Sequence, residues 1–116
     1  MDVFSQLGQI RAFERKHLPH LLTRDDCDIM RVIGLYEEQK KPLLKKQLFA
    51  EGISSNATIG RHIARLREAG YVREKRGTDK RSICLFLSPQ LRNTYRRYGT
   101  LLTSLSVGQG RIRKAG

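Results

Sequence analysis

The chain has 116 residues, enough for one domain with a hydrophobic core and short terminal extensions. Its formal net charge is +12, and its two cysteines are too few for a disulfide framework or a zinc site. No apolar run approaches the ~18 residues that a membrane span needs, and the first residues lack the basic-then-apolar order of a signal peptide. We therefore expect a soluble, cytoplasmic protein.

The positive charge is concentrated in the middle of the chain. Residues 40–98 hold fifteen Lys or Arg against four Asp or Glu, a net charge of +11, whereas residues 1–39 carry a net charge of −2. Such a basic segment attracts a polyanion, and nucleic acid is the commonest one. An anionic membrane usually recruits a basic amphipathic helix or tail instead. The charge therefore predicts a nucleic-acid partner and no membrane partner.

The first two predicted elements are helices. An N-terminal helix within residues 1–20 has apolar residues near one face until Pro19 ends it. The second helix begins after Thr23, a favourable N-cap residue with Asp26 three positions later, and stops near the lysines and proline at 40–42.

Residues 43–70 have the outline of a helix-turn-helix. A short helix over roughly 43–51 is expected to end at Gly52, and a longer helix over 56–69 is expected to stop at Gly70. The longer helix repeats apolar residues at helical spacing. Its predicted buried stripe consists of Ile59, Ile63 and Leu66.

Residues 71–87 are predicted to form a β-hairpin, because two β-prone runs flank the turn GTDKRS, in which Gly77 would supply a positive φ. A serine and a proline then begin a helix over 88–106. The basic, Gly-rich residues 107–116 are predicted to be a flexible tail. The fold class is mainly α with a small β-hairpin (α+β): a winged helix-turn-helix with flanking N- and C-terminal helices, in a single domain over residues 1–106.

The apolar residues of the last helix recur at spacings of four and three, as in a coiled-coil seam. This helix packs either on the first helix of its own chain or on a second copy of the protein. We expect a homodimer whose interface uses both terminal helices. The candidate interface residues are Phe4, Leu7, Ile10, Tyr95, Tyr98, Leu102 and Leu105.

The run ATIGRHIARLREAGYVREKRGTDKRSICLFLS, residues 57–88, resembles the winged helix of MarR-type bacterial transcriptional regulators. The resemblance lies in Thr58 and Arg61 near the start of the second motif helix, in its exit RLREAGYV, and in the pair Asp79-x-Arg81 of the hairpin. It implies a dimeric regulator that binds double-stranded DNA and often represses by occluding a promoter. It also implies a possible small-molecule effector, which the residues do not identify.

The second motif helix is the candidate for reading DNA sequence. Opposite its buried stripe it would present Thr58, Arg61 and Arg65. An arginine in the major groove can bond guanine O6 and N7, which contributes about 1 to 3 kcal/mol of discrimination. We expect Arg61 to read a base, with a phosphate contact as the alternative. Ser55 and Asn56 begin this helix, where free N–H groups suit a phosphate.

The turn of the hairpin is the second candidate DNA contact, in the minor groove. Asp79 would hold Arg81 by an ion pair and so orient its guanidinium group. Arg76 and Lys80 would add charge for phosphates, and Lys45 on the preceding helix would contact the DNA backbone.

Other functions have less support in the sequence. No motif pairs a nucleophile with a histidine, and no Gly-rich phosphate loop precedes a helix, so we expect no enzyme and no cofactor. His17 and His20 lack a third metal ligand at suitable spacing, so we expect no metal site. Two alternatives stay open: a winged-helix module for protein interaction or assembly, and a nonspecific architectural binder of DNA or RNA.

Overall fold

The computed structural model describes residues 2–79 and 81–115, with side chains described as far as residue 106. The chain forms two compact units. One is the winged-helix unit, His20–Leu91, and the other is the terminal-helix unit, which combines Met1–Pro19 with Arg92–Gly116. No helix among the described residues is both long and apolar enough to cross a membrane.

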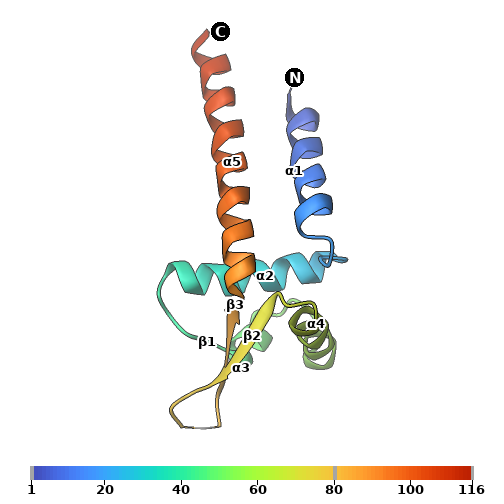
Figure 1. Cartoon of the computed structure of the whole chain (residues 1–116), viewed down its shortest axis with the longest axis vertical. Coiled ribbons are helices and arrows are strands. Elements are labelled where there is room, and N and C mark those ends of the chain that lie inside the picture. Colours follow the sequence, from blue (N-terminus) through green and yellow to red (C-terminus); the bar gives the residue numbers. More distant parts are fainter. Residues whose placement is uncertain (1, 80, 116) are drawn as a thin grey trace. The chain divides into compact units, whose positions relative to one another are not determined.

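The winged-helix unit contains three helices and three strands followed by the start of α5 (Figure 1). The β2–β3 hairpin projects away from α2, with its turn at the far end. The predicted helix-turn-helix and hairpin are therefore confirmed. The elements are α2 (Arg24–Glu38), β1 (Leu43–Leu44), α3 (Lys45–Ala50), α4 (Asn56–Glu68), β2 (Val72–Arg76) and β3 (Ile83–Leu87).

The sheet has one more strand than the sequence predicted. Its antiparallel strands follow the order β1-β3-β2, and Leu43 lies opposite Leu85. The prediction of a helix over 43–51 was wrong at its start. Leu43 and Leu44 form β1 and pair with β3, and the helix α3 begins at Lys45. Two leucines fit a strand as well as a helix, and the strand that they pair with is distant in sequence. The two residues of β1 pair only with Cys84 and Leu85 of β3. At the end of β3, the Leu87 N–H donates instead to the Glu37 carboxylate of α2 at 2.9 Å.

The core of this unit lies between α2, the α3–α4 pair and the sheet. The predicted stripe of α4 is confirmed, because all three of its side chains are fully buried. Burying one such side chain contributes about 1.5 to 3 kcal/mol relative to leaving it in water. The fully or almost fully buried residues include Ile29, Ile33, Leu43, Leu48, Ile59, Ile63, Leu66 and Leu85.

Three glycines shape the connections of the winged helix. Gly52 and Gly70 have φ of 73° and 79°, as expected for residues that follow a helix end. Gly77 was wrongly expected to have a positive φ. A Cβ at Gly77 would instead lie 3.3 Å from the Cβ of Ser82, so glycine lets the two ends of the hairpin turn approach. The Gly77 N–H donates to the Ser82 carbonyl at 2.8 Å.

The terminal-helix unit contains α1 (Val3–His17) and the part of α5 (Pro89–Ala115) from Arg92 onward, which run antiparallel (Figure 1). The Phe13 and Tyr98 rings lie 5.0 Å apart, and the Tyr98 hydroxyl donates to Glu14 Oε2 at 3.0 Å. The sequence predicted a helix end near residue 106 and a flexible tail over 107–116, but α5 continues to Ala115. No proline, the residue that blocks a helix sterically, follows residue 106 in the sequence.

Candidate nucleic-acid interface

The first turn of α4 carries a chain of hydrogen bonds on the protein surface. Ser55 caps the helix, because its Oγ accepts the N–H of Thr58 at 3.2 Å. The Ser55 hydroxyl donates to Thr58 Oγ1 at 2.9 Å, and Arg61 Nη2 donates to the same oxygen at 3.1 Å. Thr58 therefore holds the Arg61 guanidinium group near the start of the helix. The structure brings these three predicted residues together.

The same end of α4 offers backbone donors. The first hydrogen bond along the helix runs from the Ile59 N–H to the Ser55 carbonyl, so the N–H groups of Asn56 and Ala57 have no partner within the helix. Asn56, Ala57 and Arg61 are exposed. Exposed N–H groups at the positive end of a helix dipole favour a phosphate.

Arg65 lies in a different environment, which the sequence did not indicate. Its Nη2 forms an ion pair with Asp26 Oδ1 of α2, and its Nη1 donates to the His20 carbonyl at 3.0 Å. The Asp26 side chain is fully buried, whereas 36% of the Arg65 side chain is exposed. Arg65 is therefore bound within the fold, away from the chain of hydrogen bonds that holds Arg61.

The Asp26 carboxylate is ionised despite its burial. Burial alone would raise its pKa, but hydrogen bonds that stabilise the charged form lower the pKa to about 2. Since an ionised carboxylate only accepts, we place the proton of the His62 ring on Nδ1, which lies 2.7 Å from Asp26 Oδ1. The four groups that donate to Asp26 are the side chains of Arg65 and His62 and the N–H groups of Leu22 and Thr23.

The capping box of α2, predicted from Thr23 and Asp26, is confirmed. The sequence showed that Asp26 could cap its own helix, and it gave no sign of the partners from α4. These partners lie 36 and 39 residues away along the chain. No local pattern reports a contact at that separation.

A second carboxylate binds basic groups on the other flank of α4. Glu74 of β2 accepts a hydrogen bond from Arg67 Nη1 at 3.0 Å, and Lys45 Nζ lies 3.8 Å from the same oxygen. Lys45, a predicted DNA contact, is thus already beside an acidic group. Within the described part of the chain, Arg61 is the one arginine of α4 that forms no ion pair with a carboxylate.

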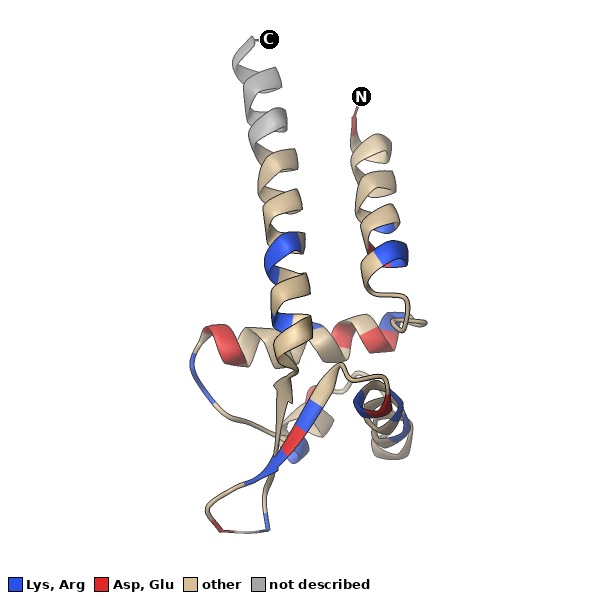
Figure 2. Cartoon of the chain, viewed as in Figure 1, with Lys and Arg blue, Asp and Glu red and all other residues tan. Residues whose placement is uncertain are grey.

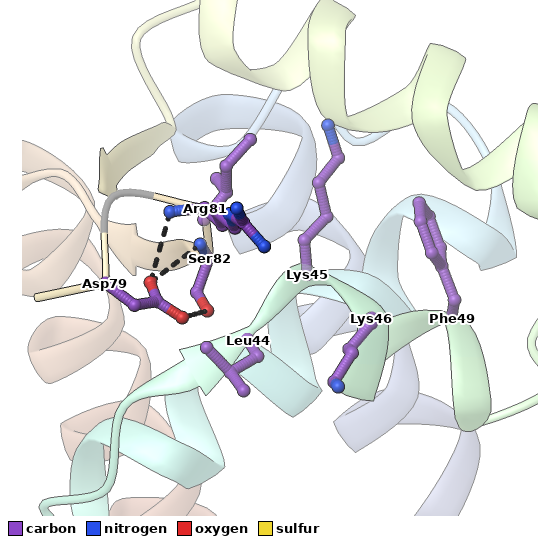
Figure 3. Close-up of a pocket in the computed structure, with 8 residues that line it drawn as sticks. Leu44, Lys45, Lys46, Phe49, Asp79, Arg81 and Ser82 are labelled. Carbon is purple, nitrogen blue, oxygen red and sulfur yellow. Dashed lines mark hydrogen bonds between the residues drawn. The ribbon is translucent and has the colours of Figure 1, made fainter. Parts of the chain in front are cut away.

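The turn of the hairpin is ordered by Asp79, but through different donors than predicted. Its carboxylate accepts the N–H groups of Arg81 at 3.2 Å and Ser82 at 3.0 Å, and the Ser82 hydroxyl at 2.8 Å (Figure 3). The hydrogen bonds from Ser82 and Arg81 lower the pKa of Asp79. The hydrogen bond from Arg81 to Asp79 comes from the Arg81 backbone N–H. The prediction of an ion pair between Asp79 and the Arg81 guanidinium group was therefore wrong. Lys80, another predicted contact, lies outside the described residues.

A hollow between α3 and the turn of the hairpin has basic side chains from both of these elements in its lining. The hollow has a volume of about 430 Å³ (Figure 3). Lys and Arg also occur on α4, along β2 and at the turn (Figure 2). Arg76 is the last residue of β2, and its side chain is exposed. The hollow is lined by Leu44, Lys45, Lys46, Phe49, Asp79, Arg81, Ser82 and Ile83.

The terminal-helix unit leaves several apolar side chains uncovered. Phe4 is 79% exposed, Leu7 is 53% exposed and Leu102 is 44% exposed. Tyr98 packs on α1 of its own chain. The other candidate interface residues, Ile10, Tyr95 and Leu105, are partly buried.

Metal chemistry has no candidate site in the described ranges. No group of three His, Cys, Asp or Glu side chains within them could hold a metal ion. Neither Cys27 nor Cys84 is in a disulfide bond there.

Neither a protein-family model nor a curated protein sequence matches this chain. Solved structures do resemble it. The S. aureus MepR–DNA complex is 8% identical with a TM-score of 0.70, covering 99% of this chain and 94% of that chain. NadR in complex with 4-hydroxyphenylacetate is 17% identical with a TM-score of 0.64, covering 93% and 72%. The M. tuberculosis transcriptional regulator MOSR in complex with DNA is 23% identical with a TM-score of 0.55, covering 97% and 84%. These likenesses show the MarR-type winged-helix fold.

Proposed function

We propose that this chain is a sequence-specific DNA-binding transcriptional regulator and not an enzyme. The observation that carries the proposal is that the three arginines of α4 have different bonding partners. Arg65 and Arg67 are bound to carboxylates, whereas Arg61 is exposed and held by a neutral hydroxyl beside the helix N-terminus. The basic charge of residues 40–98 and the fold shared with two DNA-bound proteins support the same function.

The proposed complex places α4 in the major groove. Arg61 bonds a guanine, and Thr58 keeps its guanidinium group in one direction. Ser55 and Asn56 receive a phosphate at the helix N-terminus. Lys45 adds only long-range charge, because Glu74 already lies beside it.

The hairpin is proposed to contact the minor groove and the phosphates beside it. The hydrogen bonds of Asp79 hold the backbone of the turn, so that Arg81 is presented from a fixed loop. Arg76 and Lys80 supply further positive charge. A narrow minor groove has an enhanced negative potential, which attracts such side chains.

The proposed regulator is a homodimer joined through its terminal helices. Large apolar side chains exposed at Phe4, Leu7 and Leu102 favour burial against a second copy. A two-fold dimer would place two copies of α4 on half-sites about one helical turn apart, and would therefore bind a near-palindromic operator. Repression by promoter occlusion and control by a small effector stay predictions from the resemblance.

The test is a selection of bound sequences from random DNA, followed by fluorescence anisotropy with the selected and random duplexes at several salt concentrations. We expect the selected site to bind at least about a thousandfold more tightly than random DNA. Equal affinity for all sequences would identify a nonspecific architectural binder. A protein that binds no DNA at low salt would instead be an interaction module.

A further inference from the structure

A cluster of polar side chains joins three parts of the winged-helix unit around Asp26. We call it the Asp26 cluster, and it consists of Asp26, His62 and Arg65 with the backbone of residues 20–23. Asp26 Oδ2 accepts the N–H groups of Leu22 at 2.8 Å and Thr23 at 3.1 Å. Asp26 Oδ1 binds the side chains of α4. One buried carboxylate therefore connects α4, the start of α2 and the segment that precedes α2.

Arg65 connects the same segments a second time. Its two terminal nitrogens bind different partners, Asp26 in α2 and the carbonyl of His20. The His20 N–H also donates to the hydroxyl of Tyr71, a residue in the connection between α4 and β2, at 3.1 Å. A planar guanidinium group can bridge two acceptors in this way, whereas an ammonium group is a single point of charge.

We propose that Arg65 is a positioning residue for DNA reading, which fixes α4 against α2 and thereby sets where Arg61 meets a base. The proposal rests on the proposed function. The apolar stripe of α4 gives stability, but apolar contact is not directional and does not by itself fix the rotation of the helix. Hydrogen bonds to a buried carboxylate are directional.

The position of Arg65 on the helix suits this role. Arg61 lies one turn before it, so a small rotation or slide of α4 that loosens Arg65 also displaces Arg61. A bidentate contact requires its groups within about 0.5 Å of the productive geometry. Arg67, bound to Glu74, holds the opposite flank of the same stripe. Two ion pairs thus fix the rotation of α4 and leave Arg61 between them for DNA.

The competing explanation is that Arg65 contacts a phosphate, and Arg65→Lys separates the two. The variant keeps the positive charge but loses the rigid planar fork that binds Asp26 and His20 in fixed directions. We expect about tenfold weaker binding to the selected operator, because part of the discrimination of one base contact is lost. Affinity for random DNA and the salt dependence should stay unchanged. Arg31→Lys on α2, where 65% of the arginine side chain is exposed, is the matched control and should change neither affinity.

A double-mutant cycle adds a second measurement. Asp26→Asn and Arg65→Gln should each lower the preference for the operator, and the double variant should lose little more than the worse single variant. Circular dichroism establishes that each variant is folded. Should Asp26→Asn not fold, His62→Gln replaces it in the cycle, since it weakens the same cluster from α4.

The outcomes are distinct. If Arg65→Lys binds the operator as tightly and as selectively as the wild type, the positioning role of Arg65 is overturned. The proposed function is then unaffected. Equal loss on both DNAs in Arg65→Gln, with a salt slope smaller by about 0.9, would make Arg65 a phosphate contact and also overturn it. A wild-type protein without any sequence preference would overturn the proposed function and this inference with it.

Discussion

The buried Asp26 carboxylate makes the stability of the winged-helix unit depend on pH. Its folded-state pKa of about 2 lies below the ordinary value of 3.8. A lowered pKa means that the ionised form stabilises the fold above the ordinary pKa, and that this stabilisation is lost as the pH falls towards 2. At about 1.4 kcal/mol per pKa unit, the full contribution is about 2 kcal/mol. About 1 kcal/mol of it is lost between pH 6 and pH 3.

Urea unfolding of the wild type and of Asp26→Asn at pH 6 and pH 3 measures this contribution. At pH 6 the variant should be destabilised by about 3 kcal/mol, because it leaves Arg65 without its charged partner. At pH 3 the difference between the two proteins should shrink by about 1 kcal/mol. The control is Asp28→Asn on the same helix, where the carboxylate lies 4.0 Å from Arg31 at the surface. An equal pH dependence in the wild type and Asp26→Asn would refute the argument.

Other changes test the interface and the terminal helices. Arg61→Ala should reduce the preference for the selected operator by about ten- to a hundredfold, whereas a uniform loss would indicate a phosphate contact. Leu102→Glu should give monomers in sedimentation, while the control Leu22→Glu, at a side chain 68% exposed in the other unit, should not. Partial burial and nearby cations lower the pKa of His17. Its neutral form therefore favours the fold. After correction for the intrinsic pH dependence of amide exchange, the protection of the α1 amides should fall as the pH drops below about 6.5, but not in His17→Gln. If each protomer neutralises about five phosphates, the logarithm of the binding constant should fall with the logarithm of the salt concentration at a slope of about −4 to −5. A slope near −13 would correspond to all fifteen Lys and Arg of residues 40–98 and would mean that the internal ion pairs open on DNA.

The helices and the hairpin could be predicted because their signals are local. Thr23 and Ser55 cap their helices through bonds to residues three positions away. Gly52 and Gly70 mark helix ends by a conformation that other residues rarely adopt. Each signal lies within a few residues of the feature that it predicts.

Features that depend on distant partners could not be predicted in the same way. The strand β1 exists only because Leu43 and Leu44 pair with residues of β3. Gly77 was read as a residue of unusual φ, although its role is to admit Ser82 across the turn. In both cases the deciding contact is absent from any local window of sequence.

The two arginines Arg61 and Arg65 show the same limit at the candidate site. Both lie on the side of α4 away from the buried stripe, so helical periodicity treats them as equals. Tertiary structure separates them, because Asp26 reaches Arg65 and no described carboxylate pairs with Arg61. An ion pair with a buried acid withholds an arginine from DNA, whereas a bond to the neutral Thr58 hydroxyl leaves the full charge of Arg61 exposed. Net charge alone therefore overstates how much of α4 is available to a phosphate or a base, and the positions of the acids decide which arginine is left for the proposed DNA contact.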